Sequence, residues 1–561
     1  GGGVYVESGA SFTMNGGAIA ANAAGLRGGA VYAEGTVLMA ASGTSWAIIG
    51  GTTLNDGNKA SLGGGVYVAP GGSLTIGARS EIWFNAADAF GGGAYVASGG
   101  VLDHTAAGEN AIAYNQAGKL AGGVFLAESA TRVGSASWSS SIKANTTVNN
   151  TVSSDNLPDL ARQRTVASQA ELDAALRPGF EPPYVVLSSS VSYAGTAQIA
   201  GAVAIGAINS SVTLSPSGTN GPLFEVSSGK LILCDALTLS GQGSSYQRSY
   251  PLVVVSGGSL ALCDEARIIQ NCNRYGTVPG GGIYLDGGSV TLFGGSIGGD
   301  SDSTGNESVS GAGVYVARGN FSMYSGSVSH NRVAGSGVVG GAGVYSLFGS
   351  LTLSGGSIDH NAAGAADGGG ILAMGGLVKF ATGSTTRVSA NAARSGGGVC
   401  LKDAAEFQML GGVIGGDGAS DGNGATGSGG GIFAGASGRE FRMTAGLVEG
   451  NAADGSGGGI AVSGADLTFT MGRSAKVSGN RAALSGGGLY FAKGSVSSCD
   501  VSDSIEVADN HVSKDSGLSC GAGVFIDSLP DVYAEFLNAQ ACLTGNTDAT
   551  SILVVNITKV P

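Results

Sequence analysis

A short string that recurs along the chain restricts its fold more than any other feature. Gly-Gly-Gly-Val-Tyr-Val opens the sequence, and its first four returns follow at spacings of 27, 35, 28 and 30 residues. A repeat of this length is typical of a solenoid, because each unit can bury its apolar face only against its neighbours. Copies begin at Gly1, Gly28, Gly63, Gly91, Ala121, Gly280, Gly311, Gly341, Gly368, Gly396, Gly429, Gly457, Gly486 and Gly521.

Each repeat holds three short stretches of period-2 alternation, the pattern of strands with one buried face. The first is the Val-Tyr-Val segment itself. The second alternates apolar and polar residues, as in Phe12–Met14 and Leu351–Leu353. The third leads into Ile/Val-x-x-Asn, as in Ile19–Asn22. We therefore predict an all-β fold, a right-handed parallel β-helix with three short strands per coil.

Glycine accounts for 104 of the 561 residues, whereas ordinary usage is about 7%. The chain has only 11 prolines and no Gly-X-Y period, which excludes collagen. Hydrophobic residues make up 43% of the chain and charged residues 12%, which argues against disorder. The glycines fall at two corners, GGG before the first strand and Gly-Gly before the third. Such corners need left-handed backbone or close packing, which glycine allows.

Changes in composition divide the chain into three parts. Residues 1–146 predict one β-helical segment of about five coils, and residues 184–561 a second of about twelve. Between them, glycine nearly vanishes from residues 147–183. Within this range, the sequence of Ser168–Leu176 predicts a short capped helix. Three coils carry insertions, near TTLNDGNKA, GGDSDSTGNES and GGDGASDGNGATG, that should lengthen one corner.

The net charge of −13, with no basic run, argues against nucleic-acid partners. No apolar run reaches the ~18 residues that a membrane span needs. Seven cysteines leave at least one outside any intramolecular disulfide. Cys234 and Cys263 lie in related strings 29 residues apart, so they either form a disulfide between neighbouring coils or are small core residues.

The recurring asparagine predicts a ladder at the third corner, with each side-chain amide bonding to neighbouring coils. Its role is structural. The expected members are Asn22, Asn85, Asn115, Asn145, Asn271, Asn331, Asn361, Asn391, Asn451, Asn480, Asn510 and Asn546.

The central residue of the first strand is usually aromatic, and its aliphatic neighbours should point inward. We therefore expect an outer aromatic stripe, which either stabilises the sheet by stacking or offers a flat platform to a glycan or another rod. Its members are Tyr5, Tyr32, Tyr67, Tyr95, Phe125, Tyr284, Tyr315, Tyr345, Phe433, Tyr490 and Phe525.

No residue pattern predicts a catalytic or metal site, and we expect no cofactor. His330 and His360 should stack on neighbouring coils, but no third ligand is expected to complete a metal site. Asp300–Glu307 (DSDSTGNE) is similar to a calcium loop but has Gly311 where an EF-hand needs glutamate. A looser calcium site in these Asp/Asn-rich loops is the alternative to a solvated turn.

The paired Gly-Gly-(Ala/Gly)-(Ile/Val/Leu) and (Ile/Val/Phe)-x-x-Asn elements resemble the repeats of chlamydial polymorphic outer-membrane proteins and of related bacterial β-helix (pectin-lyase-like) surface proteins. GGAI at Gly16–Ile19 and FTMN at Phe12–Asn15 match them literally. The resemblance covers nearly all of the chain except residues 147–183. It implies a secreted cell-surface adhesin, often an autotransporter passenger.

We accordingly expect an extracellular or bacterial cell-surface rod without enzymatic activity, acting as an adhesin or structural protein. Its partners would be a protein surface, a glycan surface or copies of itself. One alternative is a filament or sheath subunit that assembles end to end or laterally. The other is a polysaccharide lyase or hydrolase. Asn546–Asp548 (NTD) matches such hydrolases, but their Asp-Asp, Gly-His-Gly and Arg-Ile-Lys strings do not occur here.

Overall fold

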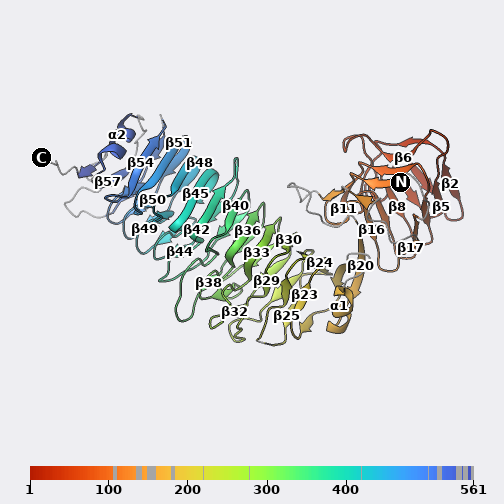
Figure 1. Cartoon of the computed structure of the whole chain (residues 1–561), viewed down its shortest axis with the longest axis horizontal. Coiled ribbons are helices and arrows are strands. Elements are labelled where there is room, and N and C mark those ends of the chain that lie inside the picture. The colour runs from red at the N-terminus through yellow and green to blue at the C-terminus, as the bar shows by residue number, and fades with distance from the viewer. Residues whose placement is uncertain are drawn as a thin grey trace. The chain divides into compact units, whose positions relative to one another are not determined.

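The chain is an all-β parallel solenoid of about 16 turns with only 3% helix. Our computed structural model describes residues 1–104, 110–133, 142–143, 145–147, 160–177, 183–218, 220–263, 265–276, 278–418, 420–502, 505–513, 521–527, 529–538, 546 and 554–556. Two compact units make up the chain (Figure 1). Unit 1 is Gly1–Ser189 with Gly201–Gly206, and unit 2 is Ser190–Ala200 with Ala207–Pro561.

Unit 1 stacks its strands in four parallel columns, a short fourth strand following the three predicted ones. The first column is β1 (Val4–Val6), β4 (Val31–Ala33), β8 (Val66–Val68), β12 (Ala94–Val96) and β16 (Val124–Leu126). The second is β2 (Ser11–Met14), β5 (Thr36–Met39), β9 (Ser73–Ile76), β13 (Val101–Asp103) and β17 (Thr131–Val133). The third is β3 (Gly17–Ile19), β6 (Ala47–Gly50), β10 (Ser80–Trp83), β14 (Asn110–Ala113) and β18 (Ile142–Lys143). The fourth is β7 (Lys59–Leu62), β11 (Ala86–Phe90), β15 (Gln116–Ala117) and β19 (Thr146–Thr147).

Unit 1 also holds the segment that breaks the repeat. This part of unit 1 contains β20 (Leu160–Val166), α1 (Gln169–Leu176) and β21 (Pro183–Leu187). Unit 1 also includes most of β24 (Ala202–Ala207). Helix α1 begins with the capping box that its sequence indicates. The Ser168 hydroxyl accepts from the Glu171 backbone N–H, and the Glu171 carboxylate accepts from the Ser168 N–H. Leu172 and Ala175 are its buried residues.

Unit 2 repeats the same columns over more coils, and several of its strands run through a corner without a break. The longest, β45 (Val399–Gly415), passes through all three main columns. The others that span a corner are β33 (Ile283–Leu292), β36 (Val314–Met323), β42 (Ile371–Phe380), β48 (Glu440–Glu449) and β51 (Leu467–Ser478).

The remaining strands of unit 2 occupy single columns. The first column contains β23 (Ala197–Ile199), β26 (Phe224–Val226), β29 (Val253–Val255), β39 (Val344–Ser346), β47 (Ile432–Ala434), β50 (Ile460–Val462), β53 (Leu489–Phe491), β57 (Val524–Asp527) and β58 (Val554–Asn556). The second contains β27 (Lys230–Leu233), β30 (Ser259–Leu262), β40 (Ser350–Leu353) and β54 (Val496–Val501). The third contains β22 (Val191–Tyr193), β25 (Thr213–Pro216), β28 (Thr238–Ser240), β31 (Arg267–Ile269), β34 (Ser296–Gly298), β37 (Ser327–Ser329), β41 (Ser357–Asp359), β43 (Arg387–Ser389) and β55 (Glu506–Ala508).

Unit 2 also has the short fourth column, and one helix near its end. The column is β32 (Cys272–Asn273), β35 (Glu307–Ser308) and β38 (Arg332–Val333), followed by β44 (Ala392–Ala393), β46 (Gly424–Ala425), β49 (Ala452–Ala453), β52 (Arg481–Ala482) and β56 (His511–Val512). The helix is α2 (Pro530–Asn538), which packs against β54.

Inward-facing side chains stack from coil to coil and form the cores. Unit 1 is filled by aliphatic residues such as Val31, Val66 and Leu74, all fully buried. Unit 2 adds a column of phenylalanines with ring centroids 4.9–6.0 Å apart. Each such burial contributes about 1.5–3 kcal/mol to folding. The members are Phe380, Phe407, Phe441, Phe469 and Phe491, each 0% exposed.

The asparagines form a continuous hydrogen-bonded ladder in each unit. Each Asn backbone N–H donates to Oδ1 of the next coil's asparagine, and in nearly every pair Nδ2 donates to the same oxygen at 2.8–3.1 Å. Nδ2 also donates to a strand carbonyl, as from Asn361 to Val328 O. All twelve predicted asparagines take part.

Three further asparagines belong to the ladder and were not predicted. Asn58, Asn306 and Asn423 each follow one of the three inserted loops and bond to both neighbouring coils. The insertion separates the asparagine from its Ile/Val, so the Ile/Val-x-x-Asn spacing is lost while the position in space is kept.

The residue before most ladder asparagines turns the corner in left-handed backbone, whereas Gly57, Gly305 and Gly422, at the ends of the inserted loops, do not. Non-glycine residues hold this position at φ between +52° and +57°, and elsewhere glycine does, as at Gly450 and Gly479. The left-handed region is costly for residues with a Cβ unless the surrounding structure imposes it. The non-glycine residues are Ala21, Phe84, Tyr114, Gln270, His330, His360, Ala390 and Asp509.

Candidate binding surface

The aromatic stripe forms an uninterrupted stack in unit 1. In-register pairing of the first column places Tyr5, Tyr32, Tyr67, Tyr95 and Phe125 on consecutive coils. Their ring centroids are 5.1–5.5 Å apart and each pair is stacked. Offset aromatic pairs of this kind stabilise a fold by about 0.5–1.5 kcal/mol each.

In unit 2 the stripe is interrupted. Tyr284, Tyr315 and Tyr345 stack at 5.5 and 4.7 Å, and Tyr490 and Phe525 at 5.5 Å. Between these groups the same position is held in turn by Leu372, Cys400, Phe433 and Ala461. Phe433 therefore has no aromatic neighbour within the stripe.

The stripe points away from the interior but is not an open platform. Tyr67, Phe125 and Tyr345 are only 5%, 1% and 5% exposed, whereas Tyr5 is 53% exposed. The chain that follows the ladder asparagine folds back over the first column, so that Phe90 lies 4.7 Å from Phe125. Other members keep part of each ring accessible.

Hydrogen bonding or burial raises the pKa of several phenols of the stripe. Tyr5 Oη donates to Glu34 at 2.7 Å, and this bond is the main cause that raises the pKa of Tyr5 to about 12. Burial raises the pKa of Tyr67, Tyr284 and Tyr315. The stripe therefore offers phenol hydroxyls as well as ring carbon to a partner.

Two buried carboxylates, Glu307 and Asp367, lie beside the fourth column of unit 2. The sequence pattern placed Glu307 at the end of the calcium-like loop but gave no signal for Asp367. Glu307 bridges Arg274 and Arg332 and contacts the Cys272 thiol at 3.4 Å. Asp367 binds Arg394 through both oxygens, at 2.9 and 2.6 Å, and Lys402 at 2.5 Å. Burial disfavours both charges, but the neighbouring cations outweigh it and lower the pKa of each carboxyl.

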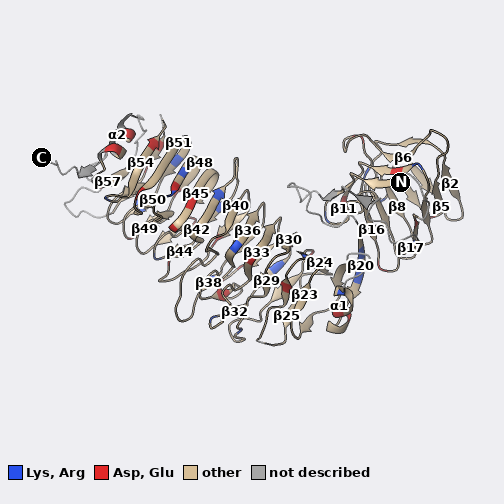
Figure 2. Ribbon diagram, viewed as in Figure 1, with Lys and Arg blue, Asp and Glu red and all other residues tan. Residues whose placement is uncertain are grey.

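Figure 2 shows basic and acidic residues together on the strands β42, β45, β48 and β51 of unit 2. Lys476 pairs with Glu506 at 2.7 Å, and Arg439 lies 3.5 Å from Glu406. Surface pairs of this kind contribute at most about 1 kcal/mol each.

His330 and His360 stack with ring centroids 4.8 Å apart, and each has a carboxylate partner that the sequence did not predict. Nδ1 of His330 lies 3.0 Å from Asp302, and Nδ1 of His360 lies 3.0 Å from Asp359. In the part of the chain that the structure describes, no three His, Cys, Asp or Glu side chains gather to hold a metal ion.

The acidic residues of the calcium-like loop contact arginine and histidine side chains. Asp300 pairs with Arg267 at 2.6 Å, Asp302 with His330, and Glu307 with Arg274 and Arg332. Cys234 and Cys263 are buried thiols without a disulfide. Asn546–Asp548 is the string that matches the polysaccharide hydrolases. Asn546 is the last ladder asparagine among the described residues, and Thr547 and Asp548 lie outside them.

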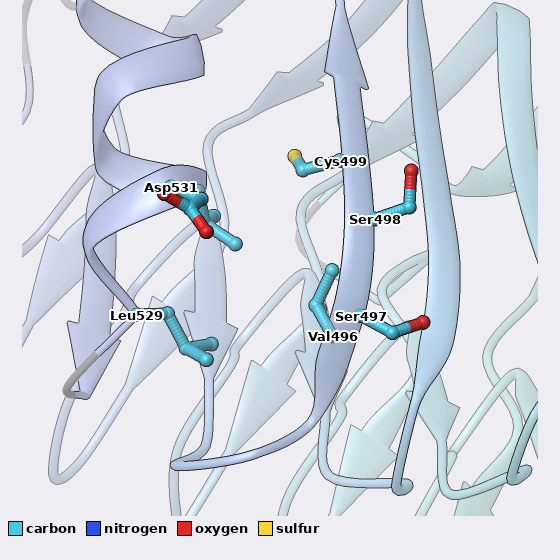
Figure 3. A pocket seen from close by; sticks show the side chains of 7 residues that line it. Val496, Ser497, Ser498, Cys499, Leu529 and Asp531 are labelled. Carbon is cyan, nitrogen blue, oxygen red and sulfur yellow. The ribbon is translucent and has the colours of Figure 1, made fainter.

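A small pocket of about 60 Å³ lies between α2 and β54 (Figure 3). Cys499 and Val496 line it from the strand, and Leu529 and Asp531 from the helix side. Burial, with the nearby charges of Glu535 and Asp500, raises the pKa of the Cys499 thiol to about 12, so it stays protonated and is a poor nucleophile. Ligand pockets are typically about 300–1,000 Å³, so this one accommodates water rather than a substrate.

Among the described residues, no helix combines the length and apolar character that crossing a bilayer requires. Comparison with protein-family models finds no family that matches the chain. Neither the curated proteins nor the solved structures provide a match.

Proposed function

We propose that this chain is an extracellular, non-enzymatic β-solenoid that presents its stacked outer side chains to another surface. The function that follows is that of a bacterial surface adhesin or surface-exposed structural protein. This agrees with the repeat's resemblance to chlamydial polymorphic outer-membrane proteins and pectin-lyase-like surface proteins. Its partner would be a protein surface, a glycan surface or a second copy of the chain.

The observation that carries the proposal is the coil-to-coil register of the aromatic stripe. Five rings in unit 1, and Tyr284, Tyr315 and Tyr345 in unit 2, are held on consecutive coils with centroids 4.7–5.5 Å apart. Solenoids use such extended surfaces for binding because many weak contacts act along one rigid body. The aligned ring edges and phenol hydroxyls suit an extended partner better than a small substrate.

A binding assay on cells or extracellular matrix tests the stripe. Tyr284→Ser combined with Tyr315→Ser removes two adjacent, partly exposed rings. We expect at least a tenfold loss of binding with the fold retained by circular dichroism, since aromatic residues dominate most interfaces. The matched control is Tyr275→Ser, which removes a tyrosine that is 70% exposed but lies outside the stripe. Equal binding by the double variant and the control would contradict the proposal.

Electron microscopy of the purified chain distinguishes an adhesin from a filament subunit. Helix α2 lies along β54 on the side away from β51 (Figure 3), so it blocks addition of another strand at that edge. We therefore expect separate particles. Continuous fibres would favour the filament.

A further inference from the structure

Unit 1 carries a second aromatic group, away from the stripe, at the corner before the ladder asparagines. Phe84 and Tyr114 occupy this corner on consecutive coils and stack with centroids 5.2 Å apart and planes 11° apart. Trp83 stands perpendicular to both, at 6.4 and 6.1 Å with interplanar angles of 86° and 88°. Three rings thus form an aromatic cluster that spans two coils.

The corner itself does not require aromatic side chains. Phe84 and Tyr114 have φ of +53° and +57°, and Ala21 and Ala390 hold the same corner at +57° and +53°. Left-handed backbone costs about 1–3 kcal/mol for a bulky residue, which is as much as one aromatic stacking pair returns. Tyr114 is also 46% exposed. The left-handed backbone is common to this corner in other coils, so it does not distinguish Phe84 and Tyr114. What distinguishes them is a stacked aromatic pair with an exposed member, and exposed aromatic clusters of this kind point to binding.

Within the sheet, the neighbours of Trp83 in register are small: Gly50 on one side and Ala113 on the other. The large side chains that contact its indole ring are those of Phe84 and Tyr114. The indole Nε1 is buried, and the side chain is partly exposed. The faces of aromatic rings carry partial negative charge and their edges partial positive charge.

Polar groups lie along the same strand face. Glu81 precedes Trp83 by two residues and therefore projects from the same side of β10. At the start of the strand, the Arg79 guanidinium lies over the Trp46 ring, 5.7 Å from its centroid. The row from Trp46 and Arg79 through Glu81 to Trp83 covers about 13 Å, the length of a four-residue strand.

We propose that this face of unit 1 binds a glycan chain of pyranose sugars, with one sugar ring packed on the exposed side of the aromatic cluster of Trp83, Phe84 and Tyr114. The axial C–H groups of a pyranose carry partial positive charge and pack on an aromatic face, and its hydroxyls meet ring edges, a carboxylate and a guanidinium. Aromatic stacking with a few polar groups is the composition that fixes small ligands in protein sites. The site lies in unit 1, and variants of the stripe in unit 2 leave it intact.

Calorimetric titration of the full chain with cellohexaose and with chitohexaose tests the proposal. We expect at least one of them to bind with a Kd on the order of 0.1–1 mM, the range for a shallow site. Tyr114→Ala should weaken binding at least tenfold. The variant should fold, because alanine already occupies this corner at Ala21 and Ala390. Tyr275→Ala is the control and should bind as the unmodified chain does.

Three results would overturn the proposal. The first is no binding of either oligosaccharide at about 5 mM, a concentration above the expected Kd. The second is unchanged binding by Tyr114→Ala with an unchanged thermal midpoint. The third is binding of a proline-rich peptide but of neither sugar, which would assign the aromatic corner to a protein partner.

Discussion

Each ladder asparagine that has a ladder neighbour on both sides uses its side chain as both acceptor and donor. Oδ1 of Asn361 accepts from the backbone N–H and from Nδ2 of Asn331, both at 3.0 Å. Its Nδ2 donates to Val328 O and to Oδ1 of Asn391. Serine is too short to reach these partners, aspartate lacks the amide donors, and the extra methylene of glutamine would displace the amide, so this corner depends on asparagine.

Replacing one such residue should be costly. In Asn361→Ala, two buried donors of Asn331 lose their acceptor, and an unsatisfied buried donor costs about 1–3 kcal/mol. We expect unit 2 to lose about 2–5 kcal/mol of stability. Hydrogen–deuterium exchange should show faster exchange of the Asn331 amide.

The same substitution at an exposed asparagine provides the control. Asn209 bonds only within its own turn, to Ser211. Asn209→Ala should change stability by less than about 1 kcal/mol. If the two substitutions lowered stability equally, the ladder hydrogen bonds would not be what stabilises unit 2.

At the scale of the element, backbone packing between coils decides which glycines are required. A Cβ at Gly430 would lie 2.4 Å from Ala452 O and 2.5 Å from Gly458 O. A Cβ at Gly424 would meet no atom within 4 Å, and its neighbours in register are Ala392 and Ala452. Two glycines six residues apart therefore have different roles.

Alanine substitutions should separate the two roles. Gly424→Ala should stabilise unit 2 by about 0.4–1 kcal/mol, because alanine restricts the unfolded chain without strain in the folded one. Gly430→Ala should destabilise it by about 1–3 kcal/mol, since the backbones of neighbouring coils must move apart. Thermal unfolding of both variants measures the difference. A loss of stability in Gly424→Ala would contradict this assignment.

Elements that recur at a regular spacing in the sequence could be predicted. Contacts that form only when the chain returns over a neighbouring coil could not. Val-Tyr-Val and Ile/Val-x-x-Asn repeat along the sequence, so strands, corners and most of the ladder follow from period alone. Asn58 stands beyond an inserted loop, and only the stacked coils return it to the ladder. The covering of Phe125 by Phe90 depends on the path of the fourth column, for which the sequence has no periodic signal. Phe84 and Tyr114 fall on a variable position of the motif.

At the scale of the whole molecule, acid should weaken unit 2 through its two buried carboxylates. Both carboxyls have a pKa below the ordinary values of 4.5 for Glu307 and 3.8 for Asp367. A lowered pKa in the folded state means that their contribution is present above the unfolded pKa and is lost as pH falls through the folded pKa. Stability should therefore hold from neutral pH to about 4.5 and then decline.

Glu307→Gln combined with Asp367→Asn tests this pH dependence. The double variant should melt at a lower temperature at pH 7, because Arg274, Arg332, Arg394 and Lys402 lose their anionic partners. Its melting temperature should also depend less on pH between 5 and 3. Glu506→Gln is the control, since that carboxylate pairs with Lys476 at the surface. Parallel melting curves for the double variant and the unmodified chain would contradict the assignment.

The aligned hydrogen bonds of the ladder also give unit 2 a row of aligned dipoles. From Asn271 to Asn510 every backbone N–H in the ladder points toward the next coil, so the amide dipoles of the side chains that accept them align. An amide dipole is about 3.5 D, and aligned dipoles leave opposite partial charges at the two ends of a row. At the start, Oδ1 of Asn271 is a buried oxygen without a donor among the described residues. The stack therefore has a negative and a positive pole, and an ionic neighbour would distinguish its two ends.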